Sequence, residues 1–326
     1  MKTLEFQFIL KARSEIAQGK CVEGNASILN RVPLVTDDGD MTEIPIISGT
    51  AMRHHCRKAI SLVILDACGL LGQVFERPDP VRLLFSGGAN TGKGNTLRID
   101  EMRALQTLVP SIRLFGGSTK NGIQFGHIEV SPAVLICEER MGDLEPWQRE
   151  ALAGWDILPA ESYVSQITNY PRDALDSLEG QSLMTDGARA DELNRRTARE
   201  KATDDEDDFA ADDAKSAARI YSSEHVKRGA LFTWDVVGHV DNDLDEATLM
   251  ATLAAFLRNP VVGKSRSVGW GRLGVMAARN FDHMRPAEAI RVVTEQELTD
   301  PSNGAALLAH IEARKDEVIA CLKAIA

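Results

Sequence analysis

This chain of 326 residues lacks any apolar run of membrane-spanning length. Its best candidate, Leu62-Val63-Ile64-Leu65, stops at Asp66, whereas a spanning helix needs about 20 apolar residues. The first residues, Met1–Glu5, alternate like a strand and lack the apolar core and cleavage site of a signal peptide. We therefore expect no membrane partner and a cytoplasmic location.

Cysteines are few, and none of the five forms a Cys-x-x-Cys pair. Structural zinc sites and disulfide frameworks both depend on regularly spaced cysteines. His54, His55 and Cys56 are adjacent, but neighbouring residues of a helix point in different directions and do not converge on one ion. The sequence predicts no metal site and no disulfide framework, in keeping with a reducing compartment.

The motifs of common enzymes are also absent. The chain holds no Gly-x-Ser-x-Gly, no His-Glu-x-x-His and no catalytic-cysteine signature. Gly87–Gly94, after an expected strand, has the glycine and lysine spacing of a P-loop, but Gly94 stands where a Ser or Thr hydroxyl should hold Mg²⁺. We predict a protein that is not an enzyme and has no cofactor; a P-loop nucleotidase is a minor alternative.

The formal charge of −11 is concentrated in one part of the chain. Residues 173–224 hold 15 Asp/Glu and 7 Lys/Arg, a net charge of −8, which leaves −3 for the rest. This segment includes the acidic run Asp204–Asp213, which we expect to be a solvated loop. An acidic total therefore does not exclude a basic nucleic-acid groove elsewhere.

The hydrophobic pattern predicts an α+β protein. Without insertions, the order is strand–helix–strand and then strand–helix–strand, which is typical of ferredoxin-like or RRM-like domains: an antiparallel sheet with helices on one face. We predict one domain over residues 1–326, with finger or helical insertions at about 69–160 and an acidic thumb or insertion at about 161–226. The expected strands are Leu4–Ile16, Ile44–Ile47, Val81–Phe85, Gly122–Ile136, Gly229–Val237 and Arg272–Ala278, and the expected helices are Ser48–Cys68, Ile99–Leu108, Leu244–Leu257 and Ala305–Ile325.

The segment Gly263–Gly274 holds four glycines in twelve residues, so its backbone can approach a ligand closely. It also holds three cations and two hydroxyls, a combination that suits a chain of phosphates. The alternative is a glycine-rich turn whose basic residues face water. The predicted RNA contacts in this segment are Lys264, Ser265, Arg266 and Arg272.

A second basic element lies early in the chain. Ser48 begins a helix whose first N–H groups and positive dipole end suit an anion. Arg53 and Arg57 are four residues apart and share one helical face, from which they could hold successive phosphates. The alternative is a capped helix with solvated arginines. The predicted contacts here are Ser48, Thr50, Arg53, His54 and Arg57.

A third glycine-and-base turn spans Arg113–Lys120. Gly117, Ser118 and Lys120 could present a hydroxyl and a cation to a phosphate or a ribose. A simple hairpin connection is an equal alternative.

Taken together, these elements resemble the RAMP superfamily and, within it, the backbone subunit of CRISPR–Cas effector complexes. The early signature of that family, a proline-containing strand, a Gly-Ser/Thr turn and a basic helix, matches Ile44–Arg57. Its late strand matches Arg228–Trp234, and its glycine-rich loop matches Gly263–Arg272. The matches follow the family's order over roughly a third of the chain.

This resemblance implies a ferredoxin-like palm with inserted fingers and a thumb, and copies that polymerise along one CRISPR guide RNA. Its partners would be the guide RNA, target nucleic acid through the guide, other copies in a helical filament and other effector subunits. The long acidic insertion favours a type IV system over type I or type III. The main alternative is a guide-processing endoribonuclease of the same superfamily, with His54 and His55 as its candidate residues.

The resemblance also implies that this chain does not cut RNA. In type III relatives an aspartate between the first strand and the basic helix cleaves target RNA, and Leu29 stands at the corresponding place here. Leucine cannot bind a metal or transfer a proton. Asn30 and Arg31 next to it are predicted RNA contacts. A shifted alignment would bring an acid to this place from Asp37, Asp38 or Asp40.

Overall fold

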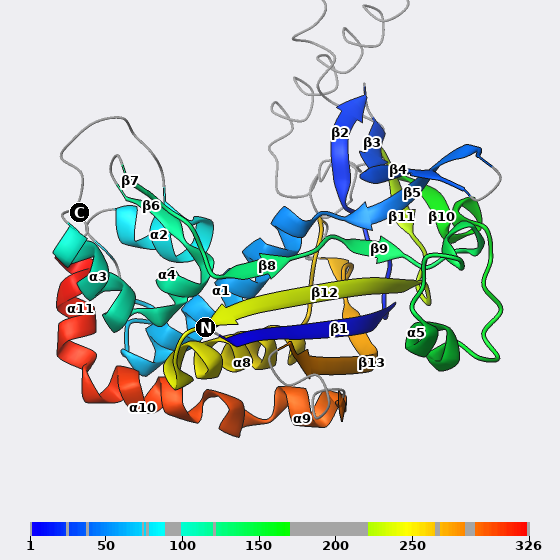
Figure 1. The fold of residues 1–326 in the computed structure, drawn as a ribbon. Helices are drawn as coiled ribbons and strands as arrows, with labels where there is room; N and C mark the ends of the chain where they lie inside the picture. Colours follow the sequence, from blue (N-terminus) through cyan, green and yellow to red (C-terminus); the bar gives the residue numbers. More distant parts are fainter. Residues whose placement is uncertain are drawn as a thin grey trace, which may run out of the picture.

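The structure is a computed structural model, and its central element is strand β1 (Lys2–Ala12). It describes residues 2–23, 26–36, 39–73, 75, 78–88, 99–119, 122–169, 221–264, 268–283 and 291–324. β1 pairs antiparallel with β12 (Leu231–Val240) along one edge and with β13 (Leu273–Asp282) along the other (Figure 1). Residues more than 200 positions apart in the chain are thereby neighbours in one sheet.

The sheet extends outward on both sides of this trio. Its strand order is β14-β13-β1-β12-β9-β5-β4, and β8 also pairs with β12. The pairings given for these strands are all antiparallel, so the protein is α+β with a mostly antiparallel sheet. The outer strands are β4 (Arg31–Val35), β5 (Met41–Ile47), β8 (Ile128–Val130), β9 (Ala133–Leu135) and β14 (Arg291–Val292).

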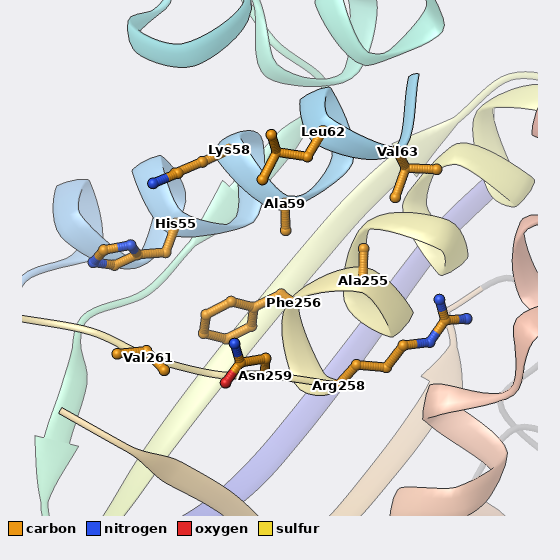
Figure 2. Close-up of a pocket in the computed structure, with 10 residues that line it drawn as sticks. All are labelled: His55, Lys58, Ala59, Leu62, Val63, Ala255, Phe256, Arg258, Asn259 and Val261. Carbon is orange, nitrogen blue, oxygen red and sulfur yellow. The ribbon is translucent and has the colours of Figure 1, made fainter. Parts of the chain in front are cut away.

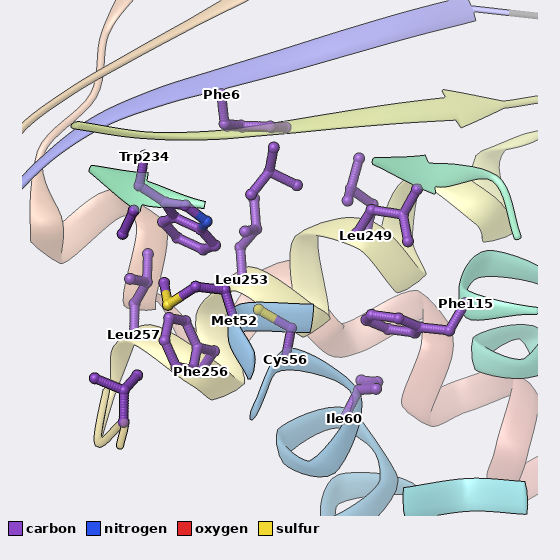
Figure 3. Packing of buried hydrophobic residues seen from close by; sticks show 14 of the residues in the cluster. Phe6, Met52, Cys56, Ile60, Phe115, Trp234, Leu249, Leu253, Phe256 and Leu257 are labelled. Atoms are coloured by element: carbon purple, nitrogen blue, oxygen red, sulfur yellow. The ribbon is translucent and has the colours of Figure 1, made fainter. Parts of the chain in front are cut away.

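Two helices cover one face of this sheet. α1 (Gly49–Ala67) and α8 (Asp243–Leu257) pack against each other and against the apolar side of the strands. In β1 the alternating residues Leu4, Phe6, Phe8 and Leu10 belong to the main core. Figure 3 shows how the two helices and the sheet meet there, with Phe6, Met52, Cys56, Ile60, Phe115, Trp234, Leu249, Leu253, Phe256 and Leu257.

Trp234 of β12 lies at the centre of this packing. Its ring stacks on Phe8 with 4.9 Å between centroids and meets Phe256 of α8 edge-on at 5.5 Å. Aromatic pairs of this geometry add about 0.5–1.5 kcal/mol beyond the burial of their area. Strand and helix are therefore held in one relative position.

Smaller helices surround α8, which explains why so many of its residues are buried. α4 (Pro110–Phe115), α9 (Glu295–Thr299), η6 (Pro301–Gly304) and α10 (Ala305–Ala313) all contact it. The remaining helices are α2 (Asp79–Ser86), α3 (Ile99–Leu108), η1 (Glu138–Arg140), α5 (Pro146–Ala151), η2 (Ala160–Tyr163) and α11 (Lys315–Ala324). None of the described helices combines the length and the apolar composition that a membrane crossing requires.

A second sheet projects from one end of the first (Figure 1). Its order is β10-β11-β3-β2, with β11 and β3 parallel. The chain leaves this sheet at the end of β10 and returns to it at the start of β11. The residues between these strands, 170–220, include the acidic run 204–213 and lie outside the described residues. The strands are β2 (Gly19–Glu23), β3 (Ala26–Leu29), β10 (Val164–Asn169) and β11 (Tyr221–Val226); a short pair, β6 (Gly117–Thr119) and β7 (Gly122–Gln124), forms a third sheet.

Several expected elements differ from the structure. Gly122–Ile136, expected as one extended segment, is three short strands, β7, β8 and β9. Val81–Phe85 is not a strand but lies within α2, because Pro80 fits the first turn of a helix and Leu83 and Leu84 bury one helical face. The expected C-terminal helix is two helices, α10 and α11, separated at Arg314. In addition, β8 and β9 lie within the range 69–160 assigned to insertions, yet both pair with the central β12.

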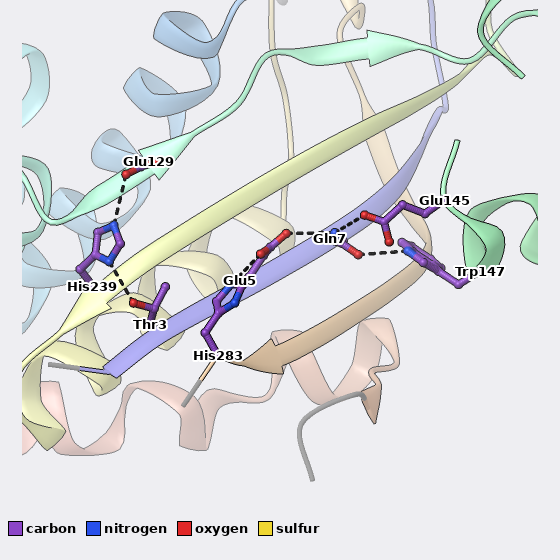
Figure 4. A network of polar contacts seen from close by, with 8 residues as sticks. All are labelled: Thr3, Glu5, Gln7, Glu129, Glu145, Trp147, His239 and His283. Atoms are coloured by element: carbon purple, nitrogen blue, oxygen red, sulfur yellow. Dashed lines mark hydrogen bonds and ion pairs between the residues drawn. The ribbon is translucent and has the colours of Figure 1, made fainter. Parts of the chain in front are cut away.

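The second face of the sheet is polar over much of β1. Gln7 donates to Glu5 and Glu145, both at 2.9 Å, and accepts from Trp147 Nε1 at 3.0 Å (Figure 4). Asp235 is opposite Gln7 in β12. Burial, with the nearby charges of Glu5 and Glu145, raises the pKa of Asp235 to about 6.

Replacing Asp235 by Asn is expected to stabilise the protein above pH 6. The carboxyl pKa is higher in the folded than in the unfolded chain, so the folded state binds more protons between about pH 4 and 6, and the free energy of unfolding falls as pH rises through this window. The neutral amide removes a cost of about 1–3 kcal/mol at pH 7.5 and much less at pH 4.5. Urea unfolding at the two pH values measures this, with Glu150→Gln as the exposed control. An equal gain at both pH values would contradict it.

Candidate nucleic-acid interface

The start of α1 has the N-cap that the sequence predicted. Ser48 is the N-cap and accepts from the N–H of Ala51 at 3.2 Å. Gly49 lies so close to the next segment that a Cβ there would stand 2.7 Å from the carbonyl oxygen of Val130. Thr50 is exposed at the helix start. The predicted cap is confirmed, and anion binding at these amides stays a prediction.

Arg53 and Arg57 do share one face of α1, but that face is directed into the protein. Arg53 donates to the carbonyls of Ile128 at 2.5 Å and Phe115 at 2.6 Å. Arg57 donates to Phe115 at 2.8 Å and Gly116 at 3.1 Å. Both guanidiniums also lie over the Phe115 ring, 5.6 and 5.4 Å from its centroid.

Burial lowers the pKa of both arginines, and the neighbouring Arg53 lowers that of Arg57 further, to about 10. Both remain charged at neutral pH, and their donors satisfy backbone carbonyls that would otherwise lack them. The structure therefore gives these arginines a positioning role for residues 115–128, and their contact with phosphates stays a prediction.

The P-loop reading of Gly87–Gly94 does not fit the described part of this loop. It requires a strand before the glycines, and here helix α2 precedes them. Gly87 ends α2 in the left-handed region, at φ 83°. A Cβ on Gly88 would stand 1.8 Å from the carbonyl oxygen of Ser118, so this glycine serves the contact between α2 and β6. Residues 89–98 lie outside the described residues.

The third turn, Gly117–Lys120, is placed by the same contact. Ser118 donates its N–H to the Gly87 carbonyl at 2.6 Å. Its Oγ is buried and has no hydrogen-bond partner among the described residues. A Cβ on Gly117 would be 2.8 Å from Leu83. Gly117 and Ser118 thus pack on α2, and Lys120 lies outside the described residues.

The late glycine-rich loop is fastened to the segment that follows β1. The Lys264 N–H donates to Ala17 at 2.7 Å, and the Gly271 N–H donates to Glu15 at 2.7 Å. Gly263 and Gly271 have φ values of 75° and 85°, which glycine adopts without strain. Part of the glycine content thus serves the fold of the loop itself.

The structure describes two of the three basic residues of this loop. Arg272 is exposed, and its backbone N–H is held by Ser14 Oγ at 2.9 Å. Lys264 is also exposed and passes close to Gly19, at the start of the second sheet. Ser265 and Arg266 lie outside the described residues. Lys264 and Arg272 are therefore the described cations of this loop that face solvent.

An aromatic group in the same loop was missed by the sequence reasoning. Trp270 stands between Gly269 and Gly271, both with positive φ, and its ring lies 5.3 Å from that of the buried His225. Trp270 is half-buried, so one part of it faces outward. The signal available in the sequence was a tryptophan flanked by two glycines in a basic loop.

A pocket joins the early helix to the late loop. It has a volume of about 390 Å³, with His55 and Lys58 of α1 on one side and Phe256, Asn259 and Val261 on the other (Figure 2). Val261 forms a bridge with Arg272, so the pocket wall continues into the glycine loop. The two basic elements predicted from sequence thus meet at one hollow, although the side chains facing it are His55 and Lys58 and not Arg53 and Arg57.

The candidate residues before β4 have structural partners. The Arg31 side chain is 14% exposed and forms an ion pair with Glu224 at 2.9 Å. The Glu224 carboxylate also accepts a hydrogen bond from the Leu29 N–H at 2.9 Å. Asn30 uses its backbone N–H and carbonyl to join Gln18 and Ile46. Arg31 therefore links β4 to β11. Its contact with RNA stays a prediction, which this geometry does not favour.

The polar face of the central sheet carries charges of both signs, with Arg140 and Arg279 beside its carboxylates. Besides Glu5 and Glu145, it holds Glu129, which pairs with His239 at 3.2 Å (Figure 4). His283 contacts Glu5 at 2.8 Å. The carboxylates on this face would repel phosphates that approach them closely. Within the described residues, no group of three or more His, Cys, Asp or Glu side chains is arranged to hold a metal ion.

Arg57→Ala is expected to lower the free energy of unfolding by about 1.5–3 kcal/mol, because the carbonyls of Phe115 and Gly116 lose a charged donor. Urea unfolding measures this, and Arg103→Ala on the exposed side of α3 is the control. Unchanged stability with a large loss of RNA binding would show that Arg57 serves phosphates and not the fold.

Comparison with known proteins identifies what this fold is like. No protein-family model matches the chain, and no curated protein matches its sequence. Among solved structures, a chain from one titled "Type IV-B CRISPR Complex" is similar, with a TM-score of 0.51 and 16% sequence identity. The similarity covers 93% of this chain and 99% of that chain. At this identity the likeness is one of fold, and it extends over nearly the whole of both chains.

Proposed function

We propose that this protein is a guide-RNA-binding backbone subunit of a CRISPR effector complex of the RAMP superfamily. The observation that carries the proposal is the likeness of fold to a chain of a type IV-B CRISPR complex over 93% of this chain. Independently of that likeness, three short sequence motifs favour the same family, and the long acidic insertion favours the same type.

The central strands support a ferredoxin-like, RRM-like palm. β1, α1, β8/β9, β12, α8 and β13 follow one another as strand–helix–strand, strand–helix–strand. In space the order is β13-β1-β12-β9, with β1 in the middle and the helices together on one face. This is the split βαβ arrangement. β10 and β11, at the two ends of residues 170–220, fit the base of a thumb.

In this proposal the guide RNA follows the side of the molecule where α1 meets the late loop. Lys58, Lys264 and Arg272 supply positive charge there, and the sheet face with Glu5 and Glu145 lies away from the RNA. Such contacts hold the backbone of a guide without reading its bases, as a subunit repeated along one RNA requires. Copies of the chain then form a filament, in which other effector subunits and the paired target are further partners.

The direct test is expression of the protein with a CRISPR array, followed by analysis of the nucleic acid that copurifies. We expect a long, protected RNA on a particle with several copies of the chain. The RNA should stay intact with Mg²⁺ or Mn²⁺, since Leu29 is 2% exposed in the core and carries no acid. A target RNA added to the assembled particle should stay intact as well.

Two outcomes would contradict this. Cleaved repeats on a monomeric protein would favour the endoribonuclease, with His54 and His55 replaced singly to find its catalytic group. Target cleavage at regular spacing, abolished by Asp37→Ala, Asp38→Ala or Asp40→Ala, would show that this loop supplies a catalytic acid. Of these three aspartates only Asp40 is described, and it is exposed.

Removing two exposed cations of the late loop should weaken binding to unrelated guides alike. For Lys264→Ala with Arg272→Ala, we expect the slope of log K against log salt to fall by about 1–1.5, because each phosphate contact to a single strand contributes about 0.7. Fluorescence titration at several salt concentrations measures this, and Arg103→Ala with Lys323→Ala is the charge-matched control. A loss confined to one guide sequence would contradict backbone recognition.

A further inference from the structure

The pocket between α1 and α8 combines apolar surface with positive charge. Its floor is apolar and includes Phe256, whose side chain is 3% exposed and belongs to the main core. Val261 continues this surface, and Leu62, which also lines the hollow, is 38% exposed. Lys58 and Arg258 complete the lining, and none of its ten described residues is acidic. The hollow therefore suits an occupant with an apolar middle and negative charge around it.

The two cations of the lining come from different helices. Lys58 belongs to α1, and Arg258 is the C-cap of α8. The Arg258 Nε donates to the Thr299 carbonyl at 3.1 Å, which limits the directions that its guanidinium can take. Figure 2 shows Lys58 and Arg258 on either side of the apolar residues Ala59 and Phe256. Anions can therefore be held on both sides of the apolar floor.

The chain itself contains a segment of matching composition. The acidic run Asp204–Asp213 has seven Asp or Glu among its ten residues, and Phe209 stands in its middle with acids on both sides. The run lies outside the part of the chain that the structure describes. A phenyl ring on the apolar floor, with carboxylates beside the cations, would satisfy both properties of the hollow at once.

The length of chain allows this segment to reach the pocket of its own molecule. The structure resumes at Tyr221, where β11 begins; β11 ends beside Ile16, and the residue after Ile16 accepts from the Lys264 N–H at 2.7 Å. Along this path Tyr221 lies about 40 Å or less from Val261, at about 3.3 Å for each residue of a strand. The 12 residues from Phe209 to Tyr221 span up to about 40 Å when extended.

We propose that the hollow between α1 and α8 binds the acidic run of the same chain, with Phe209 on the apolar floor and carboxylates beside Lys58 and Arg258. The run is then an internal competitor for polyanions, in place of the solvated loop expected from its sequence. The docking itself needs no RNA. Its effect on RNA binding rests on the proposed function, which places the guide along the same cations.

Docking within one chain can be weak and still matter. A segment tethered to its site has an effective concentration on the order of 1 mM. With a dissociation constant of about 0.1–0.5 mM for the separate peptide, the run occupies the hollow for about two thirds to nine tenths of the time. The apparent affinity for a competing RNA falls with the unoccupied fraction, by about 3- to 10-fold.

The first measurement is photo-crosslinking from position 209 of the full chain. Phe209→p-benzoylphenylalanine places a photoreactive ring there, and we expect crosslinks to peptides with residues 55–63 or 255–261, identified by mass spectrometry. Leu183→p-benzoylphenylalanine, also between β10 and β11, is the control and should not mark these peptides. Ala59→Leu fills the hollow and should remove the crosslinks, whereas Ala313→Leu on α10 should not.

The second measurement is RNA affinity without a change of charge. Phe209→Ala keeps every carboxylate, so any general repulsion of RNA by the run is unchanged. We expect RNA to bind about 3- to 10-fold more tightly to this variant, with a smaller gain for Phe209→Leu, which keeps an apolar side chain. Leu183→Ala should leave the affinity within about 2-fold, because it removes no docked group. Circular dichroism and urea unfolding confirm that each variant is folded.

The outcomes separate this inference from the proposed function. Crosslinks that spread alike from positions 209 and 183, or an unchanged RNA affinity for Phe209→Ala, would overturn the inference while wild-type RNA binding leaves the function standing. Crosslinks at the hollow in a protein that binds no RNA would support the docking and contradict the function. In a mixture of isotope-labelled and unlabelled protein, crosslinks that join the two would assign the hollow to a second copy and overturn docking within one chain.

Discussion

The pairing of β1 with both β12 and β13 is the constraint on which the other features depend. It places the first residues of the chain between segments that begin more than 200 residues later. Because β1 is buried along its apolar side, its register is fixed: a slip by one residue would turn Phe6 and Phe8 away from the helices. α1 and α8 can then occupy only the one face where those side chains project, and the loops at their ends come together.

The glycines and arginines that attract attention in the sequence have a large internal role. Gly88 and Gly271 let one backbone approach another at distances that a Cβ would prevent. Arg53 and Arg57 donate to three carbonyls, two at the end of α4 and one in β8. A basic, glycine-rich sequence pattern can therefore indicate either of two properties: close packing of one backbone segment against another inside the protein, or positive charge on its surface. Only the contacts show which residue serves which purpose.

Charge is distributed so that the two sides of the central sheet differ. On one side, beyond the helices, the cations Lys58 and Arg258 and the imidazole of His55 lie around an apolar hollow. On the other side, burial of Asp235, together with the nearby charges of Glu5 and Glu145, raises the pKa of its carboxyl to about 6. A polyanion is attracted to the first side, where none of the described residues lining the hollow is acidic, and it meets carboxylates on the second. The proposed RNA path follows from this difference more than from the net charge.

The sequence by itself determined the α+β class, the N-cap at Ser48, the spans of α1 and α8, and the strands that became β12 and β13. These depend on local signals: a capping residue, a 3.6-residue apolar period, and alternation in an extended segment. Val81–Phe85 was misread because five apolar and basic residues fit either period, and the deciding feature was the burial of Leu83 and Leu84 against other elements.

Tertiary structure alone decided which predicted site residues face outward. Helical spacing correctly placed Arg53 and Arg57 on one face, but it could not show that this face meets Phe115 and Gly116, some 60 residues away. It likewise could not bring His55 beside Val261, because 206 residues separate them and only the packing of α1 on α8 unites them. Local pattern reports the direction of a side chain relative to its own element. What stands opposite it depends on long-range packing, which no short segment encodes.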